Sequence, residues 1–260
     1  TPFAPGGSTS TVARFLGQKL TESWGQQVIV DNRPGGNTII GTEALVKSPP
    51  DGHTILLVTS AHVINPNLLA TPYDAIKDFA PVATVASGEF MLVLHPSVPA
   101  NNLREVNALA KSKPGQLNYA SSGSGSSSHL ATEFFNILAG VTMQHIPYQG
   151  GGPALTDLLA GQVQVSINVP ISLIPHIRSG KLRAIAVSGE TRLTALPQVP
   201  TFTQAGLPGY DVKTWFGVLA PAGTPKAIID KLSAEIARIL AMPEAREKLV
   251  SQGLAPFSTN

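Results

Sequence analysis

The sequence contains no cysteine and few charged or aromatic residues. Charged residues make up 13% of the 260 positions and aromatic residues 6%. The absence of cysteine excludes disulfide bonds, thiolate metal sites and cysteine nucleophiles. The formal net charge is only +2, and the Lys and Arg residues are scattered along the chain. This charge pattern argues against a nucleic-acid-binding surface.

Long apolar runs are also missing. The stretch TILLVTSA, residues 54–61, has the length of a β-strand and falls well short of the ~18 residues that a membrane-spanning helix needs. The chain opens on TPFAPGG, which resembles the end of a first strand. We therefore expect the natural protein to contain further residues before Thr1.

The remaining composition predicts an α/β fold with a substantial core. Hydrophobic residues make up 43% of the chain, and 24 Gly and 22 Pro residues indicate many tight turns. Short β-rich stretches such as QQVIVDN and HTILLVTS alternate with segments of helical periodicity. This alternation predicts mostly parallel sheets with helices packed on their faces.

Two parts of the sequence share one organisation. In the first, Gly6 to Ser10 leads into a helical pattern, and in the second, residues 122–128 do the same. The apolar positions expected to face the core are Val12, Phe15, Leu16 and Leu20 in the first helix, and Leu130, Phe134, Ile137 and Leu138 in the second. Each helix is followed by a strand and a glycine-rich turn, NRPGGNT or YQGGGP, so we expect two similar α/β units.

Two further segments indicate how these units are connected. EFMLVLHPSVPANN and TWFGVLAPAGTPKA each read as a strand that ends in proline-rich turns, one before the second unit and one after it. We expect a discontinuous first domain of residues 1–97 plus 214–260 and a second domain of residues 98–213, with two crossing strands as the hinge. A C-terminal helix from Pro225 would pack on the first domain.

The glycine- and serine-rich loops have the composition of anion-binding sites. Glycine lets backbone N–H groups approach a ligand closely, and a helix N-terminus presents unpaired donors at the positive end of its dipole. Hydroxyls and amides at strand ends, such as Thr59, Ser60 and Asn168, add further donors. Two matched loops therefore predict a ligand site between the two units.

Motifs for catalysis are absent or incomplete. The loop lacks the G-x-S-x-G of serine hydrolases, and a Rossmann fingerprint fails where Ser128 replaces the third glycine. The six histidines show no zinc-ligand spacing. We expect no catalytic residue, metal or cofactor. One alternative stays open, a serine-type α/β hydrolase of carboxylate or phosphate esters that uses Ser126 or Ser127 with His129.

The sequence resembles a known family along its whole length. PFAPGGSTSTVAR, VIVDNRPGG, IGTEALVKSPPDGHTILL, INPNL, YASSGSGSSSHLATEFF, HIPYQGGGPALTDLLAGQV and WFGVLAPAGTP are together similar to the Bug-type receptors, the periplasmic solute-binding proteins of tripartite tricarboxylate transporters. The resemblance implies a two-domain Venus-flytrap receptor with α/β domains. It also implies a periplasmic protein whose signal peptide has been cleaved.

The resemblance also implies the ligand and its contacts. The ligand would be a small organic acid, such as a dicarboxylate, tricarboxylate or aromatic carboxylate, delivered by a monomeric receptor to membrane transporter subunits. The implied ligand-binding residues are Ala4, Pro5, Gly6, Gly7, Ser8, Thr59, Ser60, Ser124, Gly125, Ser126, Ser127, Tyr148, Gln149, Gly150 and Asn168.

The chain departs from the family pattern at two places. Ser10 stands where the family usually has Asp, and we expect its side chain to cap the first helix instead. PGGNTIIG replaces the frequent PGAGGNIG, so Asn37 and Thr38 stand where the family has small residues. These two residues are expected to reshape one side of the cleft.

Overall fold

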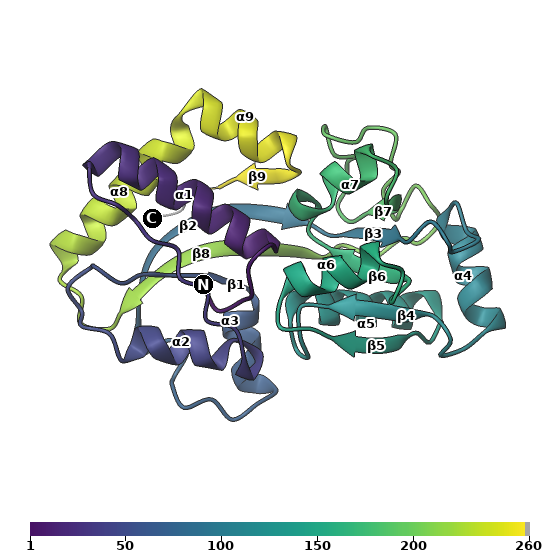
Figure 1. The fold of residues 1–260 in the computed structure, drawn as a ribbon, viewed down its shortest axis with the longest axis horizontal. Coiled ribbons are helices and arrows are strands. Elements are labelled where there is room, and N and C mark those ends of the chain that lie inside the picture. The colour runs from purple at the N-terminus through teal and green to yellow at the C-terminus, as the bar shows by residue number, and fades with distance from the viewer. Residues whose placement is uncertain (258–260) are drawn as a thin grey trace.

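A computed structural model describes residues 1–257 as two lobes arranged side by side (Figure 1). Each lobe is built on its own sheet. The first sheet has the strand order β1-β8-β2-β9 and the second the order β5-β4-β6-β3-β7. Helices pack on both sheets, which confirms the expected α/β architecture of two units.

The first sheet is antiparallel, so the expectation of a mostly parallel sheet is wrong for this unit. β8 (Lys213–Pro221) lies between β1 (Leu56–Thr59) and β2 (Phe79–Glu89) and runs antiparallel to both. The physical reason is that β8 returns from the second unit and enters the sheet between the two earlier strands. β9 (Leu254–Pro256) then pairs antiparallel with β2.

The stretch QQVIVDN, expected as a strand, also lies outside both sheets. Instead, the side chains of Val28 and Val30 pack against Gly17 of α1. The backbone N–H of Val28 donates to the Thr21 hydroxyl, also in α1, over 2.9 Å. This stretch therefore covers a helix rather than adding a parallel strand.

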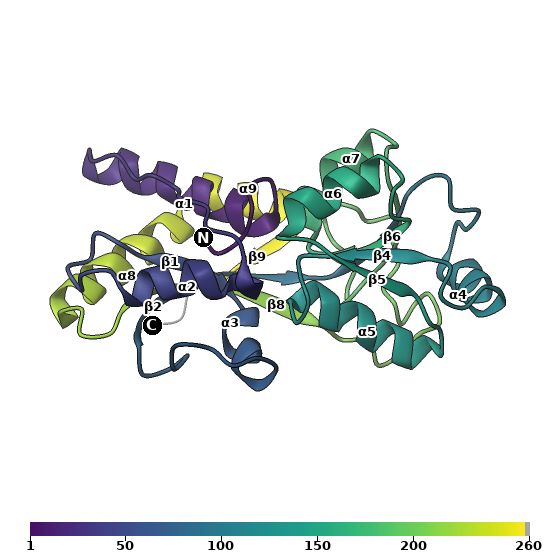
Figure 2. The same cartoon turned by 60° about the horizontal axis from the view of Figure 1, so that its bottom comes forward.

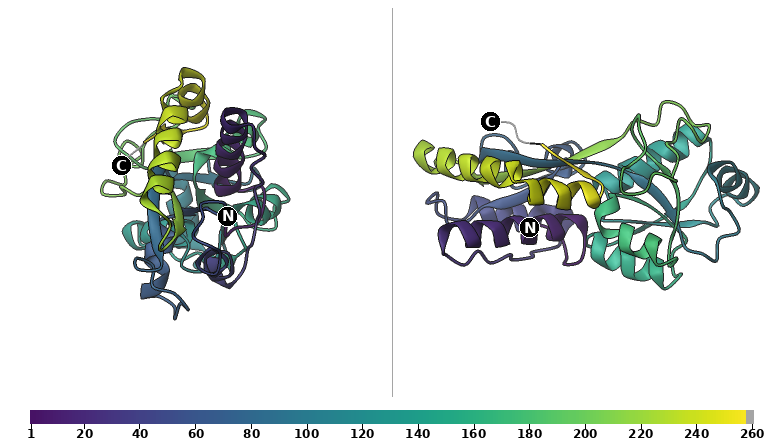
Figure 3. Two further views of the ribbon diagram at one scale, coloured as in Figure 1. Left: turned by 90° about the vertical axis from the view of Figure 1, so that its left-hand side faces the viewer. Right: turned by 90° about the horizontal axis from the view of Figure 1, so that it is seen from above.

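The helices of the first unit pack as their apolar periodicity predicts. They are α1 (Ser8–Trp24), α2 (Ile39–Val46), α3 (Ala61–Ile64), α8 (Lys226–Ala241) and α9 (Pro243–Ser251), with short 3₁₀ turns at Gly36–Thr38 and Asn65–Asn67. All four apolar positions expected to face inward from α1 are buried. α8, the expected C-terminal helix, packs on β2 and lies beside α1 (Figure 3).

The second unit contains a mixed sheet. β4 (Asn118–Ser121) runs parallel to β5 (Gln144–Pro147) and β6 (Val165–Asn168), whereas β3 (Met91–Leu94) is antiparallel to β6 and to β7 (Arg183–Val187). The helices of this unit are α4 (Leu103–Ser112), α5 (Ser127–Ala139), α6 (Gly151–Leu159) and α7 (Ile174–Arg178), with a 3₁₀ turn at Pro170–Ser172 (Figure 2).

Helix α5 buries a different face from the one expected. Phe135 is fully buried, together with Ala131 and Ala139, whereas Ile137 is 74% exposed. Phe134 and Leu138 are also exposed, so the apolar stripe taken from the sequence lies mainly on the surface. Apart from Phe135, the inward face consists mostly of small residues, because α5 packs closely over β4 and β6.

The chain passes between the two units beside Phe90, which separates β2 from β3. The boundary expected after residue 97 does not coincide with this change of sheet, because Met91–Leu94 pairs with β6 and β7 of the second sheet. The return passage is β8, which begins at Lys213, close to the expected position. At the crossing, β9 pairs with Ala86, Ser87 and Gly88 of β2.

Candidate functional site

Three helices begin at one place, where the two units face each other. α1 starts at Ser8 after Gly7, α5 starts at Ser127 after Ser126, and α6 starts at Gly151. The first backbone N–H groups of a helix have no partner within the helix and carry the positive end of its dipole. The convergence therefore gathers hydrogen-bond donors from both units around one point.

A small cavity of about 30 Å³ lies among these helix ends. Hydroxyls, an amide and the rings of Phe3, Phe90 and Phe216 surround it. Its lining consists of Phe3, Gly7, Ser8, Thr9, Thr59, Phe90, Ser122, Ser126, Ser127, Ser128, Gly151, Asn168, Val169, Thr214 and Phe216. The backbone N–H of Val169 donates to Oδ1 of Asn168 over 2.8 Å, and this hydrogen bond fixes the orientation of the Asn168 side-chain amide.

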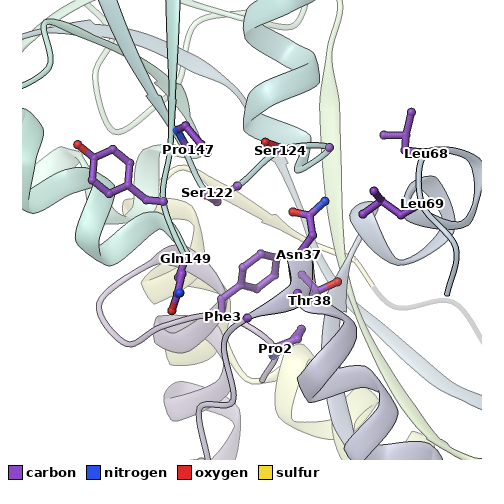
Figure 4. A pocket seen from close by; sticks show the side chains of 15 residues that line it. Pro2, Phe3, Asn37, Thr38, Leu68, Leu69, Ser122, Ser124, Pro147 and Gln149 are labelled. Atoms are coloured by element: carbon purple, nitrogen blue, oxygen red, sulfur yellow. The ribbon is translucent and has the colours of Figure 1, made fainter. Parts of the chain in front are cut away.

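A large cavity of about 420 Å³ adjoins the small one, since Phe3 and Ser122 line both. Figure 4 shows side chains from both units around it. It is lined by Pro2, Phe3, Gly35, Gly36, Asn37, Thr38, Leu68, Leu69, Ser122, Gly123, Ser124, Gly125, Pro147, Tyr148 and Gln149. None of the described residues that line either cavity is charged.

The two units contact each other directly beside these cavities. The backbone N–H of Ala4 donates to the carbonyl oxygen of Gln149 over 2.9 Å. A Cβ added to Gly7 would lie 3.2 Å from the Cα of Gly151, and a Cβ added to Gly152 would lie 1.9 Å from the carbonyl oxygen of Pro5. A side chain at Gly152 would therefore force the two backbones apart, and one at Gly7 would require the facing backbone to shift slightly.

The residues expected to bind the ligand fall into three groups in the structure. Gly7, Ser8, Thr59, Ser126, Ser127 and Asn168 line the small cavity. Ser124, Gly125, Tyr148 and Gln149 line the large cavity. Ala4, Pro5, Gly6, Ser60 and Gly150 lie in neither lining but at the contact between the units.

Two of the expected donors already have partners. The Tyr148 hydroxyl donates to Oδ2 of Asp157 over 2.7 Å, and burial together with this carboxylate raises the pKa of Tyr148 to about 12. The Ser60 hydroxyl lies 3.1 Å from that of Thr214 in β8. Ser10 does not cap α1, because Gly7 occupies the cap position and the buried Ser10 hydroxyl has no hydrogen-bond partner among the described residues.

Sequence reasoning missed one whole side of the large cavity. Leu68 is the last residue of the INPNL motif and Leu69 follows it, and Asn37 and Thr38 belong to a turn before α2. Their positions depend on the packing of segments distant in the chain, for which local pattern carries no signal. The sequence signal for this side was the departure from the family pattern at Asn37 and Thr38, and both residues line the large cavity.

A stacked pair of histidines supports the loop of residues 121–126. The rings of His129 and His145 are 4.0 Å apart and nearly parallel. Nδ1 of His129 accepts the backbone N–H of Gly125 over 3.0 Å, and Nε2 of His145 lies 2.6 Å from the Ser121 hydroxyl. Burial lowers the pKa of His129 and, helped by repulsion from His129, lowers the pKa of His145 to about 4. Both rings are therefore neutral supports of the loop at neutral pH.

The geometry does not assemble a serine nucleophile. The Ser126 hydroxyl accepts from the backbone N–H of His129 and contacts Ser128, and the Ser127 hydroxyl contacts Ser60. The His129 ring is engaged by Gly125, so it is not positioned as a base for either serine. In the structure, the three residues of the hydrolase hypothesis have other roles. Ser126 caps α5, Ser127 contacts the first unit, and His129 supports the loop at Gly125.

Within residues 1–257, no group of three or more acidic or histidine side chains is arranged to hold a metal ion. None of the helices in the same range has the length and apolar character needed to cross a bilayer.

Comparison with known proteins identifies the family. Residues 12–260 match the family model described as the tripartite tricarboxylate transporter family receptor. The chain is 40% identical over 255 residues to a protein encoded in the tcbD-tcbE intergenic region of Pseudomonas sp., covering 97% of this chain and 76% of that protein. It is 39% identical over 258 residues to protein BugT of Bordetella pertussis, covering 98% and 79%.

Solved structures agree in fold. An R. palustris protein with adipate superposes with a TM-score of 0.95 at 34% identity, over 98% of this chain and 86% of that one. MatC of Rhodopseudomonas palustris with bound malate gives a TM-score of 0.90 at 33% identity, over 98% and 87%. The two-lobed fold, the uncharged cleft and these matches agree, and the chain belongs to the receptor family of the tripartite tricarboxylate transporters, whose members are solute-binding proteins and not enzymes.

Proposed function

We propose that this receptor binds one carboxylate group of a small organic acid in the small cavity. The observation that carries the proposal is the meeting of three helix N-termini and several hydroxyls around a space with no charged lining residue. Donors of this kind stabilise an anion without a cationic side chain. About 30 Å³ of space is enough for roughly two water-sized atoms, which matches the two oxygens of a carboxylate.

The rest of the acid would occupy the large cavity. Its volume of about 420 Å³ lies within the usual range for small-molecule sites, and its lining combines apolar side chains with a few amides and hydroxyls. Related proteins of the same fold have been solved with adipate and with malate. These two acids support an organic acid with a polar group at each end as the ligand class.

The contacts between the units support a receptor that closes on its ligand. We infer a first domain and a second domain that rotate about the crossing beside Phe90 and the start of β8, as in other two-domain receptors. The carboxylate would join the ends of α1, α5 and α6, and its hydrogen bonds would add to the direct ones between the units, so that the ligand favours the closed state. The closed monomer would then deliver the acid, in the periplasm, to the membrane subunits of its transporter.

A calorimetric screen tests this function. Purified protein would be titrated with α,ω-dicarboxylates, hydroxy acids, citrate and aromatic carboxylates, and each acid that binds would be compared with its methyl ester. We expect at least one acid to bind at micromolar concentration or below, and its ester to lose at least about tenfold in affinity because the ester removes the charge that the helix ends stabilise.

A matched variant pair locates the site. Ser126→Ala removes a hydroxyl from the small cavity, whereas Ser112→Ala removes a hydroxyl that donates to Leu109 at the exposed end of α4. The first is expected to weaken acid binding and the second to leave it unchanged. Binding of sugars or metal ions instead of any carboxylate would contradict the proposed function.

A further inference from the structure

The side chain of Asn37 reaches across the cleft from the first unit to the second. In Figure 4 it points from the turn before α2 toward the loop that carries Ser122 and Ser124. A Cβ added to Gly123 would lie 2.9 Å from Oδ1 of Asn37, and one added to Gly125 would lie 3.0 Å from its Nδ2. The amide therefore lies against two glycines of the opposite loop and lines the large cavity between them.

The backbone holds Asn37 in this place at a conformational cost. Asn37 has φ 56° and Thr38 has φ 79°, and these are the two non-glycine residues with positive φ among the described residues. Such values are tolerated by Asn but are unusual for a β-branched residue such as Thr. Unfavourable backbone geometry that persists at a cleft is commonly associated with function.

A buried amide fixes this turn. Asn65 is 1% exposed, and its Nδ2 donates to the backbone oxygen of Asn37 over 2.7 Å and to the Thr38 hydroxyl over 2.9 Å. Both interactions engage the turn and leave the amide of Asn37 free, with no hydrogen-bond partner for it among residues 1–257. Its two N–H donors are thus available in a cavity that has no charged lining residue.

We propose that Asn37 is the specificity-determining residue for the end of the ligand remote from the bound carboxylate, where it selects acids that present a second hydrogen-bond acceptor over acids with an apolar end. This inference rests on the proposed function and extends it to the large cavity. The amide donates to the acceptor and contacts the opposite loop at the same time, so recognition of the distal group and contact between the units depend on one side chain.

The test compares acids that differ only at the distal end. Each α,ω-dicarboxylate from succinate to suberate is paired with the unbranched monocarboxylate of equal chain length, and dissociation constants are measured by calorimetry. Asn37→Gly removes the amide and tolerates the positive φ, which avoids the backbone strain that Ala or Leu would add. Asn37→Asp retains the shape and the tolerance of positive φ but presents only acceptors.

For the dicarboxylate that the wild-type protein binds best, we expect a preference of about tenfold over its monocarboxylate partner, the effect of one hydrogen bond to a charged group. Asn37→Gly is expected to abolish this preference by weakening the dicarboxylate much more than the monocarboxylate, which loses only the contact between the units. Asn37→Asp is expected to weaken the dicarboxylate further and to strengthen the ω-amino acid of the same length. Asn101→Gly, at an exposed position before α4 that lines neither cavity, serves as the control and is expected to keep the wild-type preference.

The outcomes separate the two proposals. If no acid binds to the wild-type protein, the proposed function fails. If acids bind but the wild-type protein does not distinguish the paired ligands, the inference about Asn37 fails. It also fails if Asn37→Gly weakens both members of a pair equally, since that result would assign Asn37 a purely structural role in the contact between the units.

Discussion

The hydroxyl oxygens of Ser60 and Ser127 lie 2.8 Å apart, although the two residues are 67 positions apart in the chain. Ser60 follows β1 in the first unit, and Ser127 is the first residue of α5 in the second. This hydrogen bond exists only while the two units are together, so it reports directly on the contact between them.

Removal of this hydrogen bond is expected to weaken ligand binding modestly. Ser127→Ala should raise the dissociation constant of the preferred acid by roughly 2- to 10-fold, since one neutral hydrogen bond contributes about 0.5–1.5 kcal/mol. Calorimetry on Ser60→Ala, Ser127→Ala and the double variant forms a double-mutant cycle. Strictly additive effects of the two single changes would contradict a direct interaction that contributes to binding.

A side chain at Gly152 is expected to prevent the contact between the units. A Cβ there would lie 1.9 Å from the carbonyl oxygen of Pro5, far inside van der Waals distance. Gly152→Ala should lower acid affinity by more than about tenfold. Its free energy of unfolding should not fall, because Ala favours the α6 helix by about 1 kcal/mol over Gly.

Small-angle X-ray scattering measures the consequence for shape. With saturating acid, the wild-type protein is expected to stay compact and Gly152→Ala to have a larger radius of gyration. Thr156→Ala, at an exposed position of the same helix, is the matched control. An unchanged affinity and radius in Gly152→Ala would show that the two units need not approach as closely as the structure has them.

The histidine pair is expected to make stability and binding depend on pH. Folding lowers the pKa of His129, and that of His145 to about 4, so below the ordinary histidine pKa of about 6.5 the unfolded chain binds more protons than the folded one. The stability present above that pH is therefore lost as the pH falls toward the folded pKa. Protonation of His129 also removes the acceptor for the Gly125 N–H.

Melting temperatures and acid affinities measured between about pH 7 and about pH 5 test this dependence. Other groups near the pair are Tyr119, which stacks on both rings, and Glu133, whose charge favours protonation of both rings. His145→Gln is expected to flatten the profile, whereas His53→Gln, on the exposed surface, is expected to retain it. Equal slopes in His145→Gln and wild-type protein would refute the assignment.

Substitutions in α5 test which face of the helix is buried. Phe135 is 0% exposed and packs beside Phe202 and Tyr210, whereas Ile137 is 74% exposed. Phe135→Ala is expected to lower the free energy of unfolding by about 3–5 kcal/mol. Ile137→Ala should change it by no more than about 0.5 kcal/mol. Urea unfolding of both variants provides the measurement, and a large cost at Ile137 would contradict this packing.

The same helix shows where prediction from sequence succeeds and fails. In α1 the apolar positions form one stripe and the other faces are polar, so the buried face follows from periodicity. In α5 the stripe of Leu130, Phe134 and Ile137 competes with one of Ala131, Phe135 and Ala139. Both stripes contain a phenylalanine and have helical spacing, so periodicity alone favours the one with more large side chains, whereas close packing on a sheet favours the one in which alanines flank Phe135.

The topology and the site each contain some features that local sequence predicts and some that it does not. Local composition predicts the segments that cross between the units. The antiparallel order of the first sheet depends instead on where β8 inserts, more than 120 residues after Phe90. No local pattern encodes this insertion point. The loops that surround the small cavity were predictable because an anion site at a helix start needs glycine and hydroxyls nearby. Leu68 and Leu69 were not, since any apolar residue can serve as a cavity wall.

The glycines at the contact between the units affect the entropy of closure as well as its geometry. Gly6, Gly7, Gly151 and Gly152 form this contact without a single rotatable side chain. Bringing long side chains together would cost up to about 2 kcal/mol each in lost rotamer freedom, whereas glycine loses none. Closure along this contact therefore freezes no rotamers, and more of the hydrogen-bond energy from the acid remains as binding affinity.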